Sequence, residues 1–406
     1  MTKINYFEIL NYRSCIKTRV EVNTNLTTLI GINGVGKSNI LQSFQLLKKI
    51  RRNRYFALQK ELLDSLSHSI LTIGFDYNEE KYTLKVEVFY ETDDRNIDEI
   101  FTATIQIKHN SDTNSKRIRW QDVDIDLLEV VDRSRHMGRS VRQLNLFGTH
   151  LSKDTLNVAI FLLEYINNIS YYGATVFSDP SKCPISLELE DTRPLRNLRN
   201  SKPHDKFMHD LYLTYKNHNK NFQKYLNTVN KIGIGIVDDI KFYEHNMPSS
   251  SYEIKSGGKL KQIERTKNII IPSFIIDELN LSPNQLSEGT FKTLALVFYI
   301  LNDDSELLII EEPEVCIHHG LLSSIIELIK IQSKHKQIFI STHSDFVLDQ
   351  LEPENIVLVR KDLNSGTIAT SLTKSLKKND YAALKEYLAN SGNLGEYWKE
   401  GGFENG

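Results

Sequence analysis

The stretch Gly31-Ile32-Asn33-Gly34-Val35-Gly36-Lys37-Ser38 decides the fold. It matches the pattern GxxxxGK followed by Ser or Thr, it follows an apolar run at residues 26–30, and it precedes a segment with apolar residues at helical spacing. In that setting the glycines let successive backbone N–H groups point inward at a helix N-terminus, where they bind phosphate. The sequence therefore predicts a phosphate loop in which Lys37 neutralises phosphate oxygens and the Ser38 hydroxyl binds Mg²⁺. The expected backbone cradle consists of Gly31, Asn33, Gly34 and Gly36.

Two adjacent carboxylates form a second group of candidates. They stand at the end of an apolar run in Leu307-Leu308-Ile309-Ile310-Glu311-Glu312-Pro313-Glu314. Ligands of open α/β sheets bind at the carboxyl ends of strands, where one carboxylate can hold Mg²⁺ through water and the next can deprotonate an attacking water. We assign Glu311 to the metal and Glu312 to the water. An acidic helix N-terminus is the alternative interpretation, because acids there complement the helix dipole.

Two shorter signals extend this pattern. Leu286-Ser287-Glu288-Gly289-Thr290 precedes an apolar helical segment shortly before the acidic pair, which favours a second phosphate-binding helix N-terminus with Ser287 as a reasonable N-cap. Ser341-Thr342-His343-Ser344 follows an apolar run of strand length. From that strand end, His343 is expected to reach the terminal phosphate.

These four elements resemble the ABC ATPase superfamily, specifically the branch with RecF-like, SMC-like and OLD-like proteins. Asn11-Tyr12-Arg13-Ser14 resembles the Asn-Phe/Tyr-Arg-Ser motif of that branch, whose arginine approaches the nucleotide phosphates, and Asn39 after Gly-Lys-Ser is typical of it. The tail Gly392-Asn393-Leu394-Gly395-Glu396-Tyr397-Trp398 is similar to the end of stand-alone ATPases in bacterial defence operons, including relatives of the Septu, PARIS and Gabija ATP-binding subunits. The motif-bearing resemblance covers residues 1–50 and 280–406.

The resemblance implies ATP and Mg²⁺ as cofactors and a homodimer, or a higher oligomer built on it, with head-to-tail subunits. Ser287 and Gly289 of one subunit would complete the site of the other, and hydrolysis would open the dimer. Glu311 stands where aspartate is usual, and its extra methylene points to slow turnover. The glutamine that normally follows the β arm in this superfamily has two candidates here, Gln121 and Gln143.

The length of 406 residues exceeds the size at which one core usually keeps growing, so we expect more than one body. The predicted fold class is α/β: an ABC-type P-loop NTPase head with an antiparallel β arm and an inserted helical lobe. The head takes residues 1–60 and 270–406, the arm 61–123, and the mainly helical lobe 124–269. Within the lobe we expect an irregular loop at 177–199, a helix pair at 206–229, and a surface loop at Pro248-Ser249-Ser250-Ser251.

Composition narrows the protein classes. A net charge of −2 excludes global basicity as an argument for nucleic acid, although local basic clusters occur near Trp120 and Tyr171. These clusters would line a nucleic-acid groove or dock an acidic partner. They are Lys116, Arg117, Arg119, Arg133, Arg135, Arg139, Arg142, Arg193, Arg196 and Arg199.

Three further patterns favour ordinary structural explanations over a metal site, a disulfide framework or a membrane segment. His204-Asp205 and His209-Asp210 recur at a five-residue offset, which suits a solvated helix face better than a metal site. Three cysteines without a CxxC pair indicate neither a disulfide framework nor a zinc site. No apolar run reaches the length that spans a bilayer, so we expect no membrane contact and a cytoplasmic protein.

The function expected from these patterns is an ATP-driven sensor or scaffold in a bacterial defence system. Its inserted lobe would hold an effector, such as a nuclease or toxin encoded nearby, because the motifs describe a complete ATPase head and no nuclease domain fits after His343. The alternative is a RecF-like repair ATPase that binds DNA directly.

Overall fold

The computed structural model describes residues 3–50, 68–77, 79–91, 100–110, 120–123, 161, 165, 169–190, 203–254, 260–390, 392–401 and 403. The chain divides into two compact units. The first unit comprises Met1–Tyr171, Asp304–Glu312 and Ile329–Gly406. The second unit comprises Tyr172–Asp303 and Pro313–Leu328. No helix in the described part of the chain combines the length and apolarity needed to cross a bilayer.

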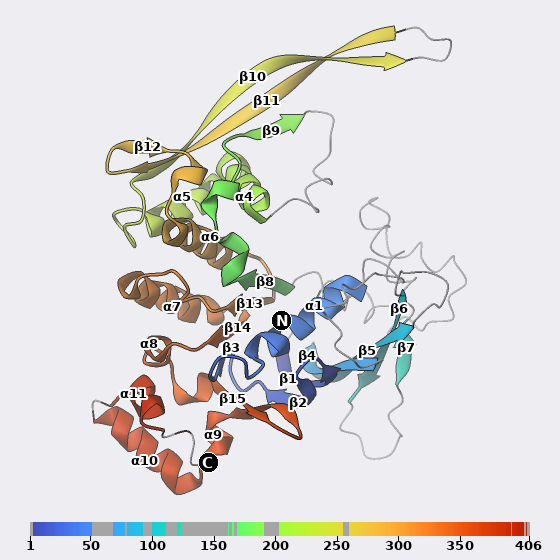
Figure 1. Cartoon of the computed structure of the whole chain (residues 1–406), viewed down its shortest axis with the longest axis vertical. Helices are drawn as coiled ribbons and strands as arrows, with labels where there is room; N and C mark the ends of the chain where they lie inside the picture. Colours follow the sequence, from blue (N-terminus) through green and yellow to red (C-terminus); the bar gives the residue numbers. More distant parts are fainter. Residues whose placement is uncertain are drawn as a thin grey trace. The chain divides into compact units, whose positions relative to one another are not determined.

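A central sheet of six strands organises the first unit (Figure 1). In spatial order its strands are β16 (Gly366–Ser371), β15 (Ile356–Asp362), β3 (Leu26–Ile30), β14 (Gln337–Thr342), β13 (Leu307–Glu311) and β8 (Ile169–Gly173). The strands β15, β3, β14 and β13 are parallel, which confirms the predicted α/β class. Every residue of β3 and β14 is buried, as expected for strands of a parallel sheet that is covered on both faces.

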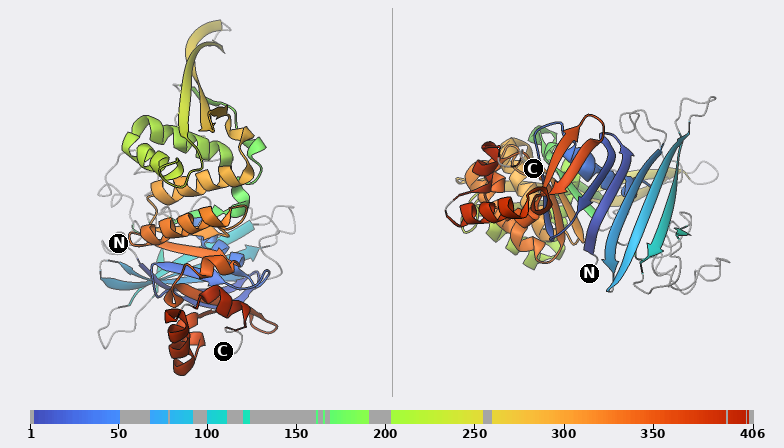
Figure 2. Two further views of the ribbon diagram at one scale, coloured as in Figure 1. Left: turned by 90° about the vertical axis from the view of Figure 1, so that its left-hand side faces the viewer. Right: turned by 90° about the horizontal axis from the view of Figure 1, so that it is seen from below.

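The N-terminal sheet is the second layer of this unit and is antiparallel throughout. In order it contains β2 (Cys15–Glu21), β1 (Lys3–Tyr12), β4 (His68–Tyr77), β5 (Glu80–Glu91), β6 (Ile100–His109) and β7 (Gln121–Val123). The expected antiparallel strands therefore form, and they continue the sheet begun by β1 and β2 (Figure 2).

Helix α1 (Lys37–Ile50) packs between the two sheets. Phe44 on this helix contacts Phe7 of β1 and Phe339 of β14, with ring centroids 4.9 and 5.9 Å away. All three rings are almost fully buried, and such aromatic pairs contribute about 1 kcal/mol each beyond their burial. The phosphate-loop helix is thereby fixed to both layers.

The opposite face of the central sheet is covered by C-terminal helices. Ile30 and Leu358 point to this side and pack with Leu348, Leu384 and Leu394. The covering elements are α8 (Asp345–Leu348), η7 (Pro353–Asn355), α9 (Leu372–Ser375), α10 (Lys378–Ala389) and α11 (Leu394–Lys399).

The second unit combines helices with a long hairpin. Phe207 of α4 packs edge-on against Phe291 and Phe298 of α6, at 5.5 and 5.6 Å between centroids. The helices are α4 (Pro203–Asn217), α5 (Asn219–Val229), α6 (Glu288–Asn302) and α7 (His319–Ser333), the last of which ends in the first unit. The remaining elements are η3 (Ala174–Phe177), η4 (Pro180–Lys182), β9 (Leu187–Glu190), β10 (Asp239–Ile254), β11 (Leu260–Ile276), β12 (Leu279–Leu281) and η6 (Pro283–Gln285).

Two loop predictions in this unit are wrong. Pro248 and the serines after it lie in β10, which pairs with β11 from Asp239 to Ile254 in the long ribbon of Figure 1. Pro248 is tolerated because β10 is an edge strand among the described residues, where a missing N–H need not cost a ladder bond. The expected irregular loop also contains the short strand β9, which pairs with β11.

The predicted helix pair is confirmed by α4 and α5, but its histidines are not solvated. His204 and His209 are only 5% and 4% exposed. The His204 ring stacks on Phe291 at 5.4 Å, and its Nε2 lies 3.1 Å from the carbonyl of Ser178. Packing against α6 therefore explains the burial of His204. Of residues 124–167, the first part of the expected helical lobe, only Phe161 and Tyr165 are described, and both are helical and buried.

Candidate nucleotide site

The phosphate loop joins β3 to α1 in the first unit. Gly34 and Gly36 have φ angles of 83° and 105°, which favour glycine because a side chain would be strained there. Lys37 is 5% exposed, and its Nζ donates to the carbonyls of Gly31 and Ile32 at 2.7 and 3.1 Å. The loop thus curls around the ammonium group that we expected to meet phosphate.

A pocket of about 330 Å³ adjoins the start of this loop. Gly31 and Ile32 line it together with Arg360 of β15 and the C-terminal side chains Trp398 and Phe403. The tail that carries the resemblance to defence ATPases therefore lies beside the phosphate loop.

The Asn-Tyr-Arg-Ser motif contacts the first turns of α1. Arg13 Nη1 donates to Asn39 Oδ1 at 3.1 Å and to Gln42 Oε1 at 2.5 Å. Asn39 Nδ2 in turn donates to Ser14 Oγ at 2.7 Å. Two residues suggested by family resemblance, Arg13 and Asn39, are thus brought together, whereas Gln42 was not among the candidates.

Thr367 of β16 supports the loop from behind. Its Oγ1 lies 2.8 Å from Ser14 Oγ and donates to the carbonyl of Val35 at 2.8 Å. A methyl group added at Gly36 would stand 2.2 Å from the same Oγ1. Thr367 gave no signal in the sequence, because its strand lies far from the loop along the chain.

The acidic pair ends β13. Glu312 has a φ of 46°, and its N–H donates to the carbonyl of Ser341 on β14 at 2.9 Å. His343 Nδ1 lies 3.7 Å from Glu312 Oε1, with side chains 40% and 33% exposed. Because β13 and β14 are parallel neighbours, the two predicted catalytic groups meet at one sheet edge, accessible to water.

Glu311 has a different environment. Its Oε2 accepts a hydrogen bond from the Tyr171 hydroxyl, and burial together with this carboxylate raises the pKa of Tyr171, so the phenol remains a donor. Its Oε1 is buried and has no hydrogen-bond partner among the described residues, and neither has Ser341 Oγ across the strand pair. A buried carboxylate oxygen without a donor is costly, and a hydrated Mg²⁺ would supply the missing partner. The residues present therefore fit the expected metal.

Ser287 and Gly289 lie in the second unit at the start of α6. Ser287 is the N-cap of this helix, as expected, since its Oγ accepts from the N–H of Thr290 at 3.2 Å. A Cβ added at Gly289 would stand 2.5 Å from the carbonyl of Cys316, so the helix end tolerates only glycine there without a shift.

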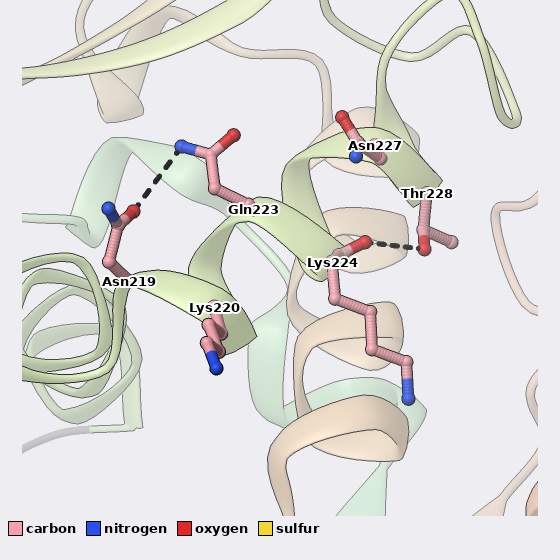
Figure 3. Close-up of a pocket in the computed structure, with 6 residues that line it drawn as sticks. All are labelled: Asn219, Lys220, Gln223, Lys224, Asn227 and Thr228. Carbon is pink, nitrogen blue, oxygen red and sulfur yellow. Dashed lines mark hydrogen bonds between the residues drawn. The ribbon is translucent and has the colours of Figure 1, made fainter.

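A shallow pocket of about 610 Å³ lies on the polar face of α5 in the second unit (Figure 3). Two of its bonds stay within the helix: Gln223 donates to Asn219 Oδ1 at 3.5 Å, and Thr228 donates to the carbonyl of Lys224 at 2.8 Å. No predicted site residue lines this pocket.

Several sequence-level candidates fall elsewhere. The basic clusters at 116–119, 133–142 and 193–199, and Gln143, lie outside the described residues. Gln121 pairs with Ile107 at the edge strand β7, and nothing is described of its side chain. Tyr171, named above with the basic clusters, instead contacts Glu311. No group of three or more His, Cys, Asp or Glu side chains suited to a metal occurs among the residues described.

The comparisons with known proteins concern the same elements. Residues 184–349 match the family model described as "AAA domain, putative AbiEii toxin, Type IV TA system". This range holds Ser287, Glu312 and His343, and the phosphate loop lies before it. No curated protein matches the chain.

Among solved structures, the chain is similar to three SMC heads. The SMC head domain from Thermotoga maritima is 13% identical with a TM-score of 0.44, covering 91% of this chain and 98% of that one. An SmcHead bound to the C-winged helix domain of ScpA is 13% identical with a TM-score of 0.49, and the match covers 92% of this chain and 100% of that one. An Smc head domain with an extended coiled coil, bound to the C-terminal domain of ScpA derived from Pyrococcus furiosus, is 13% identical with a TM-score of 0.47, and the match covers 96% of this chain and 100% of that one. The parallel strands of the central sheet give the chain an α/β fold, and the family match and the phosphate loop together indicate an ATPase domain of the P-loop class.

Proposed function

We propose that this protein binds ATP with Mg²⁺ and hydrolyses it. The observation that carries the proposal is the convergence at one edge of the central sheet. The buried Lys37 follows β3, Glu312 follows β13, and His343 follows β14, and these three strands are parallel neighbours. Ligands of parallel sheets bind at that edge.

The hydrolytic step requires a base beside an accessible water. Glu312 accepts the proton of the attacking water, and His343 orients this carboxylate and contacts the terminal phosphate. The fixed backbone of Glu312 supports this role, since its N–H bond to Ser341 holds the carboxylate near His343. Lys37 neutralises the phosphate oxygens, and Arg13, Asn39 and the loop backbone complete the cradle.

The metal would be held by the Ser38 hydroxyl and the Glu311 carboxylate. When bound, Mg²⁺ would neutralise charge on the β and γ phosphates. The buried, unpartnered Glu311 Oε1 supports its participation.

We further propose a head-to-tail dimer in which Ser287 and Gly289 of a second copy close the site. The N-terminus of α6 supports this, because Ser287 is exposed there and the positive end of the helix dipole suits phosphate. A mixing experiment tests it. Lys37→Ala and Ser287→Arg should each abolish hydrolysis alone, and a mixture should recover part of the activity, because one site of each mixed dimer is intact. If the mixture of the two variants recovers no hydrolysis, the shared site is contradicted.

We also propose that ATP hydrolysis controls an effector protein in a bacterial defence system. The C-terminal tail beside the phosphate loop, and a family match whose description names a toxin, support this choice. Affinity purification of the tagged protein from its native operon should recover a nuclease or toxin encoded nearby. Recovery of the protein alone, with tight salt-sensitive binding to DNA in fluorescence anisotropy, would instead favour the repair alternative.

A further inference from the structure

We propose that Tyr171 is a positioning residue for the metal-binding carboxylate of Glu311, and that Gln42 and Arg13 extend this contact to the phosphate-loop helix. The inference rests on the proposed function and names residues to which neither the sequence motifs nor the family match assigns this role.

Two hydrogen bonds within the first unit, from Arg13 to Gln42 and from Tyr171 to Glu311, are linked through the Gln42 amide group. Gln42 also influences the pKa of Tyr171, after burial and Glu311, and because Arg13 donates to Gln42 Oε1, the Gln42 amide nitrogen is the donor available to the phenol oxygen. Tyr171 then donates to Glu311 Oε2. Each donor in this series points toward the Glu311 carboxylate, and hydrogen bonds that are aligned in one direction polarise one another. The chain therefore runs from a guanidinium on the N-terminal sheet, through α1, to the end of β13.

This arrangement decides which oxygen of Glu311 meets the metal. The Tyr171 hydroxyl occupies Oε2, and Oε1 remains buried without a partner among the described residues. A glutamate has one more rotatable bond than the aspartate usual at this position, so an external contact is needed to hold it in one geometry. Tyr171, on the neighbouring strand β8, provides that contact from the side of the sheet. Outer contacts that orient metal ligands typically change metal affinity by 10- to 100-fold when removed.

The chain also gives Arg13 a second role. Its guanidinium is bonded to Asn39 and Gln42 on successive turns of α1, one directly after the phosphate loop and one beside Tyr171. Movement of this helix on nucleotide binding would therefore shift the position of the Glu311 side chain.

The test measures metal binding without turnover. Binding of a fluorescent, non-hydrolysable ATP analogue to the full-length protein is titrated with Mg²⁺. Tyr171→Phe should raise the Mg²⁺ midpoint by about tenfold, while analogue affinity without metal and the melting temperature stay unchanged. Tyr172→Phe is the matched control: its hydroxyl donates to the carbonyl of Lys292, and its removal should leave the Mg²⁺ midpoint unchanged.

A double-mutant comparison isolates the contact itself. Glu311→Asp shortens the side chain and removes its reach to the phenol, so adding Tyr171→Phe to Glu311→Asp should cause no further shift. If Tyr171→Phe fails to fold, Gln42→Met tests the same chain and should raise the midpoint by about threefold. An unchanged Mg²⁺ midpoint in the folded Tyr171→Phe protein, or in Gln42→Met, overturns the inference. Absence of analogue binding by the wild-type protein would instead overturn the proposed function.

Discussion

The strands beneath the candidate site and the strands of the long hairpin follow opposite rules of burial. Every residue of β3 and β14 is buried, whereas Tyr243 to Pro248 of β10 are all exposed. Close packing on both faces fixes a backbone, so groups at the ends of β3, β13 and β14 are held in place. The hairpin is held mainly by its ladder of paired residues. The candidate catalytic groups therefore lie at the ends of rigidly packed strands, which suits a precise site, whereas Tyr243 to Pro248 of the hairpin face solvent.

The largest effect is expected on ATP affinity, when two lysines are replaced separately. Lys37→Ala removes a buried ammonium at the end of β3 and should weaken ATP binding by roughly 1,000-fold, about 4 kcal/mol, because charge-assisted contacts to phosphate are lost. Lys220→Ala removes an exposed ammonium on α5 and should leave the affinity unchanged. Isothermal titration calorimetry with Mg·ATP measures both. Equal losses of affinity in the two variants would show that positive charge anywhere on the protein surface, and not the phosphate loop, binds the nucleotide.

A second pair tests burial directly. Ile340→Ala in β14 should destabilise the protein by about 3 kcal/mol, because it leaves a cavity in a fully packed sheet. Tyr243→Ala in β10 should change stability by less than about 0.5 kcal/mol, since this side chain is 47% exposed. Urea denaturation followed by circular dichroism gives both values. A large loss at Tyr243 would mean that the hairpin is packed like the site.

The predictability of these regions from sequence follows the same division. The largely apolar runs at 26–30, 307–310 and 337–340 have the length of strands and predict buried ones, and the motifs at their ends therefore specify Lys37, Glu312 and His343 together. Pro248 and its serines were interpreted as a loop because turn residues dominate there, yet an exposed ladder tolerates them. His204 and His209 were expected in solvent, because the five-residue offset gives no sign that both are buried or that the His204 ring stacks on Phe291 of α6.

Supporting contacts of the site were not predictable from local patterns. Tyr171 meets Glu311, and Thr367 meets Ser14 and Val35, across more than a hundred residues of sequence in each case. Neither residue belongs to a motif, and only the order of strands in the central sheet brings them near the site.

A third prediction compares two glycines of the phosphate loop. Gly36→Ala should cost about 2 kcal/mol in unfolding free energy, because the new methyl meets Thr367 Oγ1 and the backbone has positive φ. Gly34→Ala has the same backbone strain but open space around its Cβ, so about 1 kcal/mol is expected. Chemical denaturation of both variants measures the difference. A larger loss for Gly34→Ala would contradict the contact with Thr367.

A fourth prediction concerns pH. Burial raises the pKa of the Cys15 thiol from 9.0 to about 11, so the folded state keeps a proton that the unfolded state loses. Its contribution is therefore complete below pH 9 and is lost as pH rises toward 11, by about 1.4 kcal/mol at pH 10. The drop in unfolding free energy from pH 8 to pH 10 should be smaller by that amount in Cys15→Ala. An equal drop in both proteins would place the thiol in a more polar environment.

The central claim is that Glu312, at the end of β13, is the base of an ATP-hydrolysing site. Single-turnover hydrolysis of Mg·ATP by Glu312→Gln tests it most directly, with Glu306→Gln, which lies just before the start of β13, as the matched control. Glu312→Gln should bind ATP, accumulate as a dimer and hydrolyse at least about 1,000-fold more slowly than the wild type, while Glu306→Gln hydrolyses normally. Hydrolysis by Glu312→Gln at the wild-type rate would contradict the account.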